Sequence, residues 1–536
     1  MSKKQLINNI WQFIFSKWVI YVTIFLVPLY FSTSHWFLFI TPKTLLIIAG
    51  TLFASIFFVW GMIKNKGENI QVTSLHYILF SFLFIMSLAG FFGVDPHSSF
   101  FGTFFSSVGI VFLIFLGLLA CLVSEFTRRD FNFISRLLAT VFISGVIVAL
   151  ISYFPLFGFK SKVLELSSWG STMGNSSFAG TFLLFAVGFG GYLTFTAEGW
   201  KKKLFNVLGI LVILLCPIFF NADFWRGVVS LSDIFHSPLL ASGDAQGAQL
   251  GVVVLAFSSI FLWFVVSSKK TTKIIGIILF IILMASLSIG YFKLLQPESA
   301  IHQRFTEMKK ATRFLFWDIS ERAIVERPLL GFGFQNYQTV YQQHFDPIAL
   351  KTGYVDEQAV TNPHNVIYDM AVSSGIPGLL IYLTLLGFTC FVFIKFAGNY
   401  GGKDRWIIIL SGTLLGYFIQ NLFVFDTPTA YFMYFICIGL AMGCLSIRKP
   451  EKEILIPVEN MFKRKVIGYI FSVILFILFI LFVVLPSIES RQWQNLRSFS
   501  LAGEVQKIED VASISLMGGA SDDARYTNEV LNNVDD

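Results

Sequence analysis

The sequence predicts an all-α polytopic membrane protein with about 12–13 transmembrane helices and one large loop between two of them. Hydrophobic residues make up 55% of the 536 residues and charged residues only 13%, about half the roughly 25% that is usual in soluble domains. The mean hydropathy is +0.72, and the apolar residues gather in repeated runs of about 20, the length that crosses a bilayer. These observations exclude a soluble globular fold.

Thirteen runs have the length and composition of a membrane span. They cover residues 17–34, 43–63, 73–92, 103–124, 135–156, 177–195, 204–221, 248–267, 274–292, 375–396, 406–424, 429–446 and 466–486. A short segment with Pro42 and Lys43 separates the first two runs, and the run at 177–195 is rich in glycine, so its helix could be broken.

The basic residues of the short connections predict the orientation, because cytoplasmic loops carry an excess of Lys and Arg. One alternate set of connections holds Lys3, Lys4, Lys17, Lys64, Lys66, Arg128, Arg129, Lys201, Lys202, Lys203, Lys269, Lys270, Lys273, Lys403, Arg405, Arg448, Lys449, Lys463, Arg464 and Lys465. Before residue 293 the opposite set holds only Lys43, Lys160, Lys162 and Arg226. We therefore expect a cytoplasmic N-terminus and an extracytoplasmic C-terminal tail. The net charge of +7 follows from this pattern and does not indicate a nucleic-acid partner.

The cysteines do not predict a disulfide framework or a metal site. All five fall in or beside apolar runs, and none has metal-ligand spacing. We expect no cofactor and no bound metal.

The spans and connections predict four regions. Residues 1–292 form an N-terminal transmembrane bundle, 293–374 a large extracytoplasmic catalytic loop, and 375–486 the C-terminal transmembrane helices. A loop of this size is usually functional. Residues 487–536 are a polar tail with a weak helical pattern, which is either the start of a helical-repeat domain or a frayed end.

Inside the large loop, residues 313–327 have the apolar spacing of an amphipathic helix, and Pro328 would end it. A second helix is expected to begin with Asn362 as its N-cap and Pro363 in its first position. His364 would then lie in the first turn. The free N–H groups there disfavour a protonated imidazole and attract anions, so His364 is a candidate general base beside a phosphate.

Several segments then resemble one known family. The residues that carry the resemblance are Arg313, Trp317, the run 327–333 (RPLLGFG), Asn336, Tyr337, Tyr341, His364, Asn365, the run 375–378 (GIPG), the early segment 94–102 (VDPHSSFFG) and the segment 170–175 (GSTMGN). This pattern resembles the O-antigen ligase family, a superfamily of ligases and polymerases that act on lipid-linked glycans.

The resemblance implies a glycosyltransferase-C-like helical fold in the bacterial plasma membrane and a role in lipopolysaccharide biosynthesis and the cell envelope. Such enzymes move a glycan from undecaprenyl diphosphate to an acceptor hydroxyl on a lipid A core sugar, a glycan repeat or a protein, without a metal. The resemblance also implies that His364 acts on the acceptor hydroxyl and that Arg313 binds the diphosphate. Asn365, Tyr337 and Arg327 are candidate substrate-binding residues, although Arg327 also fits a structural role.

The chain departs from the family at one position. Members have Ser-Arg-Gly at the outer start of the span that follows the second outer loop, where this chain has Gln246. An amide can donate a hydrogen bond to phosphate but brings no charge. Arg226, in the same loop, is a candidate to replace the missing arginine.

Other readings remain beside these. His364 can be a helix-start residue without a chemical role, Arg313 an interfacial residue, and Asp426 either an N-cap or a neighbour of the active site. A glycan polymerase or a protein O-oligosaccharyltransferase would share the motifs. A lipid-linked sugar transporter or flippase is less consistent, because the spans hold few ionisable residues and show no internal duplication.

Overall fold

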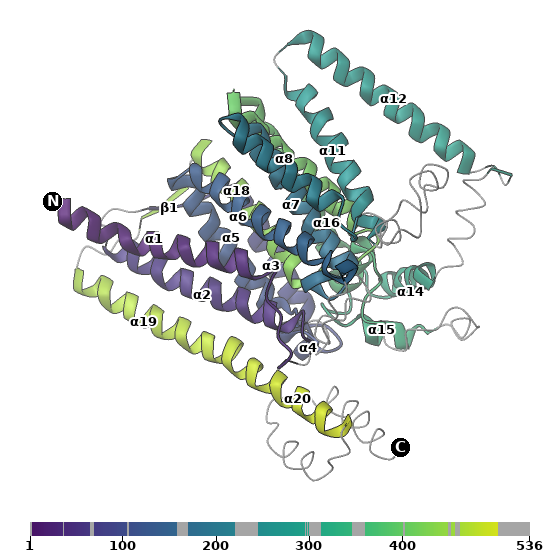
Figure 1. Cartoon of the computed structure of the whole chain (residues 1–536). Coiled ribbons are helices and arrows are strands. Elements are labelled where there is room, and N and C mark those ends of the chain that lie inside the picture. Colours follow the sequence, from purple (N-terminus) through teal and green to yellow (C-terminus); the bar gives the residue numbers. More distant parts are fainter. Residues whose placement is uncertain are drawn as a thin grey trace.

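The computed structural model describes residues 3–35, 37–64, 69–103, 107–157, 170–219, 245–267, 269–294, 296, 298–299, 312–345, 360–399, 402–448, 452–455 and 461–501. Most of the long helices run side by side and form one bundle (Figure 1). One end of the bundle carries strand β1, and we call it the β1 end. The opposite end carries the short helices α4, α14 and α15, and we call it the α14 end.

Each of the thirteen predicted spans overlaps a helix. These helices are α1 (Lys3–Leu26), α2 (Thr41–Lys64), α3 (Ser74–Phe91), α5 (Ile110–Arg129), α6 (Asn132–Ile151), α7 (Ser176–Thr196), α8 (Trp200–Leu214), α11 (Gln246–Val266), α12 (Lys270–Leu294), α16 (Val366–Asn399), α17 (Ile408–Gln420), α18 (Pro428–Arg448) and α19 (Met461–Phe479). Within the described residues, nine helices are long and apolar enough to cross a membrane. The prediction of an all-α polytopic membrane protein is confirmed.

The remaining elements are short. They are α4 (Pro96–Phe101), α14 (Thr312–Glu326), α15 (Tyr337–Gln343), α20 (Leu485–Leu501), three 3-10 turns (Phe154–Phe157, Ser171–Met173, Gly402–Ile407), a π-helical turn (Ile480–Val484) and the strands β1 (Asn69–Val72) and β2 (Lys452–Leu455). The two strands pair antiparallel, with Asn69 opposite Leu455. They form a small sheet beside the helices.

The bundle is packed around α18, whose residues from Ala430 to Cys444 are buried. Gly439 and Gly443 let α18 approach α5 closely, because a Cβ at Gly439 would lie 2.6 Å from the carbonyl oxygen of Ala120. The periphery is apolar as well, and α12 exposes a row of isoleucines, including Ile277 and Ile281. An apolar exterior of this kind suits a lipid surrounding.

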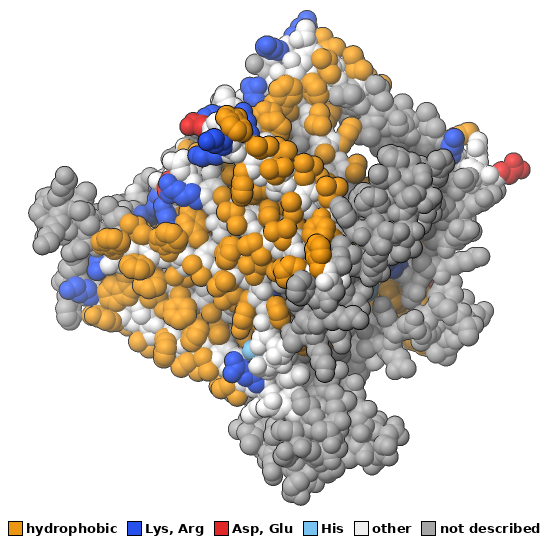
Figure 2. All heavy atoms as spheres, viewed as in Figure 1, with side chains coloured by type: hydrophobic (Ala, Val, Ile, Leu, Met, Phe, Trp, Pro, Cys, Tyr) orange, Lys and Arg blue, Asp and Glu red, His pale blue; other side chains and the backbone are white. Residues whose placement is uncertain are grey.

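The charged side chains are distributed unevenly over this exterior. Figure 2 shows an apolar face with Lys and Arg gathered mainly along the edge nearest the β1 end of the bundle. The helices α14 and α15, which belong to the predicted large loop, lie at the other end. On the face that Figure 2 shows, the described Lys and Arg side chains therefore gather towards one end of the bundle.

The structure answers the open question of whether the glycine-rich span is broken, and it corrects the placement of Lys43. The glycine-rich α7 is an unbroken helix, since Gly188 and Gly190 pack directly against Thr413 and Phe142 of neighbouring helices. Lys43 is not a loop charge: it lies in the first turn of α2, is 2% exposed, and donates to the carbonyl oxygens of Tyr30 and Thr172. Two backbone acceptors compensate for its burial.

The helix that begins at Met461 continues beyond the predicted span end. The π-helical turn lies just before Pro486, and α20 carries the helix to Leu501. A π turn accommodates the missing N–H of proline without ending the helix. His35, in the α1–α2 connection, contacts the hydroxyl of Ser487 at 3.1 Å and so holds α20 against the bundle. Residues 502–536 of the predicted tail lie outside the described part of the chain.

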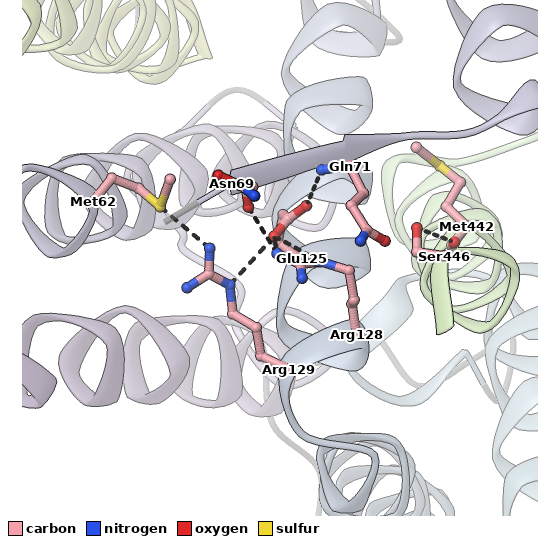
Figure 3. Close-up of polar contacts among 8 residues, drawn as sticks. All are labelled: Met62, Asn69, Gln71, Glu125, Arg128, Arg129, Met442 and Ser446. Carbon is pink, nitrogen blue, oxygen red and sulfur yellow. Dashed lines mark hydrogen bonds and ion pairs between the residues drawn. The ribbon is translucent and has the colours of Figure 1, made fainter. Parts of the chain in front are cut away.

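A carboxylate network closes the β1 end of the bundle (Figure 3). Glu125, at the end of α5, is 4% exposed and accepts from the backbone N–H of Gln71 at 3.0 Å. Its other oxygen accepts from Arg128 at 2.6 Å and from Arg129 at 3.3 Å. Arg128 also donates to the carbonyl oxygen of Asn69 at 2.8 Å. One buried carboxylate therefore joins α5 to β1 and, through β1, to β2.

Replacing this carboxylate should destabilise the fold. The Glu125→Ala change leaves Arg128 and Arg129 partly buried and without the carboxylate, so we expect the free energy of unfolding to fall by about 3 kcal/mol. The matched control is Arg136→Ala, because Arg136 is 60% exposed and pairs with Asp130. Its loss should cost under ~1 kcal/mol. Denaturation of both variants in mixed detergent micelles measures the difference, and equal losses would contradict the network's importance.

Candidate active site

The site is built on α14, which forms where the sequence predicts it. Phe316, Ile319 and Ala323 recur at helical spacing and are 2%, 0% and 0% exposed. They pack under the helix in a small separate core that also contains Phe332 and Val372. Pro328 follows directly after the last turn, where it cannot continue the helix. The predicted helix at 313–327 is confirmed to within one residue at each end.

A backbone ladder fastens α14 to α16. The N–H of Phe332 donates to the carbonyl of Val372 at 2.8 Å, and the N–H of Ile376 donates to the carbonyl of Pro328 at 2.8 Å. The ladder forms because α16 is kinked at Ser374 and at Gly375, whose φ is +68°. Left-handed backbone of this kind favours glycine. The kink opens the helix's own hydrogen bonding and makes backbone groups available to the neighbouring turn.

The helix that follows the large loop begins later than predicted. α16 starts at Val366, and Asn365 caps it by accepting from the N–H of Ile367 at 2.9 Å. Asn362 instead accepts from the N–H of His364 at 3.3 Å and forms a turn before the helix. The prediction that Asn362 caps the helix and that His364 lies in its first turn was therefore wrong. His364 precedes the cap, in a left-handed conformation with φ of +55°.

Two aromatic rings flank the imidazole of His364. The ring of Phe316 is stacked at 6.0 Å between centroids, and the ring of Phe425 meets the imidazole edge-on at 5.3 Å. Phe316 comes from α14, and Phe425 from the connection between α17 and α18. Trp317 donates its indole N–H to the carbonyl of Pro363 at 3.1 Å and so fixes the backbone beside His364.

The surroundings keep this imidazole neutral. Burial and, to a smaller extent, the nearby positive charge of Arg313 lower the pKa of His364 to about 4, against the opposing effect of a hydrogen bond with the backbone of Asn362. The sequence argument expected a neutral histidine because of the helix terminus, whereas burial and a guanidinium are the main causes. At neutral pH His364 is therefore uncharged.

The hydrogen bond of the ring determines which nitrogen is basic. Nδ1 of His364 lies 3.2 Å from the carbonyl oxygen of Asn362. A carbonyl oxygen only accepts, so Nδ1 carries the proton and Nε2 carries the lone pair. The arrangement therefore provides a neutral imidazole whose Nε2 can take a proton.

The other sequence-predicted site residues lie on different elements of the fold. Arg313, in the first turn of α14, has an exposed side chain near His364. Gln246 is the exposed first residue of α11, one position before Gly247, which packs against Gln420 at the end of α17. Arg226 lies outside the described residues.

Two further candidates occupy supporting positions. Tyr337 is 3% exposed and donates its hydroxyl to the carbonyl of Phe316 at 2.8 Å. This hydrogen bond therefore helps to fix the backbone of Phe316, whose ring stacks on His364. Arg327 lies at the other end of α14, with its guanidinium over the ring of Phe332 at 4.7 Å. These contacts give both residues a packing role whether or not they also touch a ligand.

The structure resolves the two readings of Asp426. Thr427 accepts from the N–H of Ala430 at 3.3 Å at the start of α18, so Asp426 is not the cap. Its carboxylate accepts from the hydroxyl of Tyr417 at 2.7 Å and from the amide of Asn421 at 2.8 Å. Burial raises the pKa of Asp426 to about 6, against the effect of these two donors. Asp426 thus anchors the connection that carries Phe425.

The segment 170–175 supports the site from another side. Asn175 caps α7 by accepting from the N–H of Ser177 at 2.8 Å, and Gly174 has a φ of +75°. One turn further on, Phe178 meets the ring of Phe425 edge-on at 5.2 Å. The segment 170–175 therefore contributes to the site indirectly. It fixes where α7 begins, and so where Phe178 contacts Phe425.

The sequence analysis missed Phe425. In the segment Phe425-Asp426-Thr427-Pro428, the sequence indicated only the carboxylate of Asp426 as a candidate. No periodicity identifies Phe425, because its partner His364 is 61 positions away and belongs to another segment.

The described residues contain no group of three His, Cys, Asp or Glu side chains placed to hold a metal ion.

The fold and this site define a polytopic α-helical membrane protein with a neutral histidine and an arginine at one end of its bundle. Residues 239–383 match the family model described as O-antigen ligase. The match confirms the resemblance to the O-antigen ligase family. It covers α11, α12, α14, α15 and the kinked start of α16, and it points to a ligase or glycosyltransferase enzyme. No curated protein matches the chain.

The kink of α16 offers a direct test of how the site is assembled. A Cβ on Gly375 would lie 2.4 Å from the backbone of Leu329, and its left-handed backbone alone costs an alanine about 1–2 kcal/mol. We expect Gly375→Ala to release α14 from α16, seen as faster proteolysis within residues 312–345 and a lower Tm. Gly387→Ala in the same helix is the control, since no atom lies within 4 Å of its Cβ position. Equal behaviour of the two variants would refute the role of the ladder.

Proposed function

We propose that this protein transfers a glycan from undecaprenyl diphosphate to an acceptor hydroxyl at the extracytoplasmic face of the bacterial plasma membrane. The observation that carries the proposal is the pairing of a neutral imidazole with a guanidinium near it, at one end of a membrane bundle. The family match over the same residues supports a glycosyl-transferring enzyme.

His364 is the proposed general base. Its Nε2 takes the proton of the acceptor hydroxyl as the hydroxyl oxygen attacks the anomeric carbon of the donor glycan. The bond from that carbon to the diphosphate oxygen breaks, and its electron pair leaves with the diphosphate. A positioned base contributes about 10²–10⁴-fold to such a step. Asn365 supports it by capping the helix directly after His364.

Arg313 is the proposed partner of the leaving group. A guanidinium stays charged at every relevant pH and binds phosphate oxygens in pairs. It can therefore neutralise the diphosphate as negative charge develops there, which is our reason for proposing a metal-independent reaction. The same charge adds to the effect of burial in keeping His364 unprotonated before the reaction. One residue thus serves both halves of the chemistry.

Further contacts with the substrate are proposed for Gln246 and Arg226. Gln246 is exposed at the N-terminus of α11, where its side-chain amide and the positive end of the helix dipole favour a phosphate oxygen. Arg226 would add the positive charge that the family places in this region. Tyr337, at the start of α15, and Arg327, directly after α14, are proposed to act by packing against the residues of the site rather than by contacting the ligand over a distance.

The charge distribution supports the proposed orientation. Lys and Arg gather towards the β1 end of the bundle, which we assign to the cytoplasm with the N-terminus, and the α14 end then faces outward. The acceptor hydroxyl can belong to a lipid A core sugar, a glycan repeat or a protein side chain. The last two correspond to a glycan polymerase and a protein O-oligosaccharyltransferase, which use the same chemistry.

Removing the proposed base tests the assignment. We expect His364→Ala to lower the transfer rate by roughly 10²–10⁴-fold while the protein still inserts into the membrane. The measurement is glycan transfer by purified protein from an undecaprenyl-diphosphate donor to defined acceptors. His97→Ala is the control, because His97 is exposed on α4 beside Phe101. Transfer retained by His364→Ala would remove this residue from the mechanism.

The arginine can be tested separately. Arg313→Gln should reduce transfer by about 10²–10³-fold, because an amide cannot neutralise the leaving diphosphate. It should also raise the pKa of His364 above its wild-type value, since a nearby positive charge is lost. Arg313→Lys keeps the charge and should leave that pKa low. Arg322→Gln, on the exposed side of the same helix, is the control for both assays. An unchanged rate in Arg313→Gln would contradict the role.

A further inference from the structure

We infer that Phe425 is a positioning residue: its ring, opposed by Phe316, holds the imidazole of His364 in place and shields it from water. The inference rests on the proposed function only for the use of the imidazole as a base. The arrangement itself follows from the ring contacts.

The two rings approach the imidazole in different ways. Phe316 lies nearly parallel to it, with an interplanar angle of 27°, and Phe425 stands nearly perpendicular, at 84°. Both geometries are among those that aromatic pairs prefer. Because the rings come from separate segments, the imidazole is confined from two directions. Neither phenylalanine ring carries a polar group that could form a hydrogen bond with Nε2 of His364.

Phe425 is held firmly enough to perform this role. Phe178 of α7 braces its ring at 5.2 Å. The neighbouring Asp426 is tied to Tyr417 and Asn421 of α17. The carbonyl of Asn421 also accepts from the N–H of Val366 at 2.8 Å, two residues after His364. This hydrogen bond joins the connection that carries Phe425 to the segment that carries His364.

The charged groups around the imidazole can be named element by element. α14 contributes Arg313, whose charge opposes protonation of His364. The connection after α17 contributes Asp426, which is already paired with two donors, and α16 contributes Asp369, which lies near Asp426. The brace on α7, Phe178, is uncharged. Among the described residues, the group that favours a protonated His364 is the backbone of Asn362 and not a carboxylate.

Opening this enclosure should change the titration of His364. In Phe425→Ala, water reaches the imidazole and the cost of burying a charge falls. The pKa of His364 should then rise from about 4 towards the ordinary 6.5. The sign follows from the cause, because burial disfavours the charged form and exposure restores it. Arg313 remains in place, so the rise is partial, and we expect roughly one pH unit or more.

The experiment measures this pKa directly. Deuterium exchange at Cε1 of the histidine rings, read by mass spectrometry across pH on the purified full-length protein, gives the midpoint for His364 without any transfer assay. Phe425→Ala should shift the midpoint upward, and Phe425→Tyr, which keeps the ring, should restore the wild-type value. The control is Phe423→Ala, because Phe423 makes no ring contact in the described part of the chain. Its midpoint should match the wild type.

The transfer assay adds a second readout. In Phe425→Ala the acid limb of the pH–rate profile should move upward by the same amount as the titration midpoint, with the KM for the donor unchanged. If Phe425→Ala does not fold, Phe425→Leu keeps the apolar volume, loses the ring edge, and should give a smaller upward shift.

The outcomes separate this inference from the proposed function. An unshifted midpoint in folded Phe425→Ala, or an equal shift in Phe423→Ala, overturns the role of Phe425 even if the wild type transfers glycan. A shifted midpoint in a protein that transfers no glycan supports the enclosure and refutes the proposed reaction.

Discussion

The backbone ladder between the residues that follow α14 and the kink of α16 determines how α14 lies relative to the segment that carries His364. Each of its hydrogen bonds contributes only about 1 kcal/mol net, but a buried backbone group left without its partner costs more. The kink at Gly375 exposes the carbonyls of Val372 and Ser373, and the turn at Phe332 and Gly333 uses them. α14 is thereby fixed against α16, with Arg313 and Phe316 beside His364.

The rest of the site depends on shielding the imidazole of His364 from water while its Nε2 stays accessible to a substrate. Phe316 stacks on the imidazole, Phe425 packs against it edge-on, and the carbonyl of Asn362 accepts a hydrogen bond from its Nδ1. What remains is a single basic nitrogen next to a permanent positive charge. That combination suits a reaction in which a hydroxyl loses a proton while a diphosphate leaves. The carboxylate network of Glu125 lies at the β1 end of the bundle, opposite the end that carries this site.

The fold was largely predictable because its causes are local. Span length, apolar content and helical spacing depend on neighbouring residues, so all thirteen runs and α14 could be found from the sequence. The start of α16 could not, because Asn362 and Asn365 are both good caps. Only the structure shows that Asn362 is used in a turn. Lys43 was misplaced because its acceptor Thr172 is 129 positions away.

The candidate site was predictable in its chemistry and not in its surroundings. The resemblance pointed to His364 and Arg313 as a pair, and the structure places Arg313 near enough to lower the pKa of the imidazole. Phe425 and its brace Phe178 could not be found, since long-range ring contacts leave no periodic signal. The cause of the neutral histidine was likewise hidden, because burial depends on packing rather than on sequence position.

The most direct measurement is an experimental structure of the protein in a lipid bilayer with a non-transferable undecaprenyl diphosphate glycan bound. The account predicts that the diphosphate lies within about 3 Å of the Arg313 guanidinium and that Nε2 of His364 faces the side from which an acceptor would approach. A diphosphate bound at the β1 end of the bundle, or one that lies away from Arg313 with His364 enclosed on every side, would contradict it.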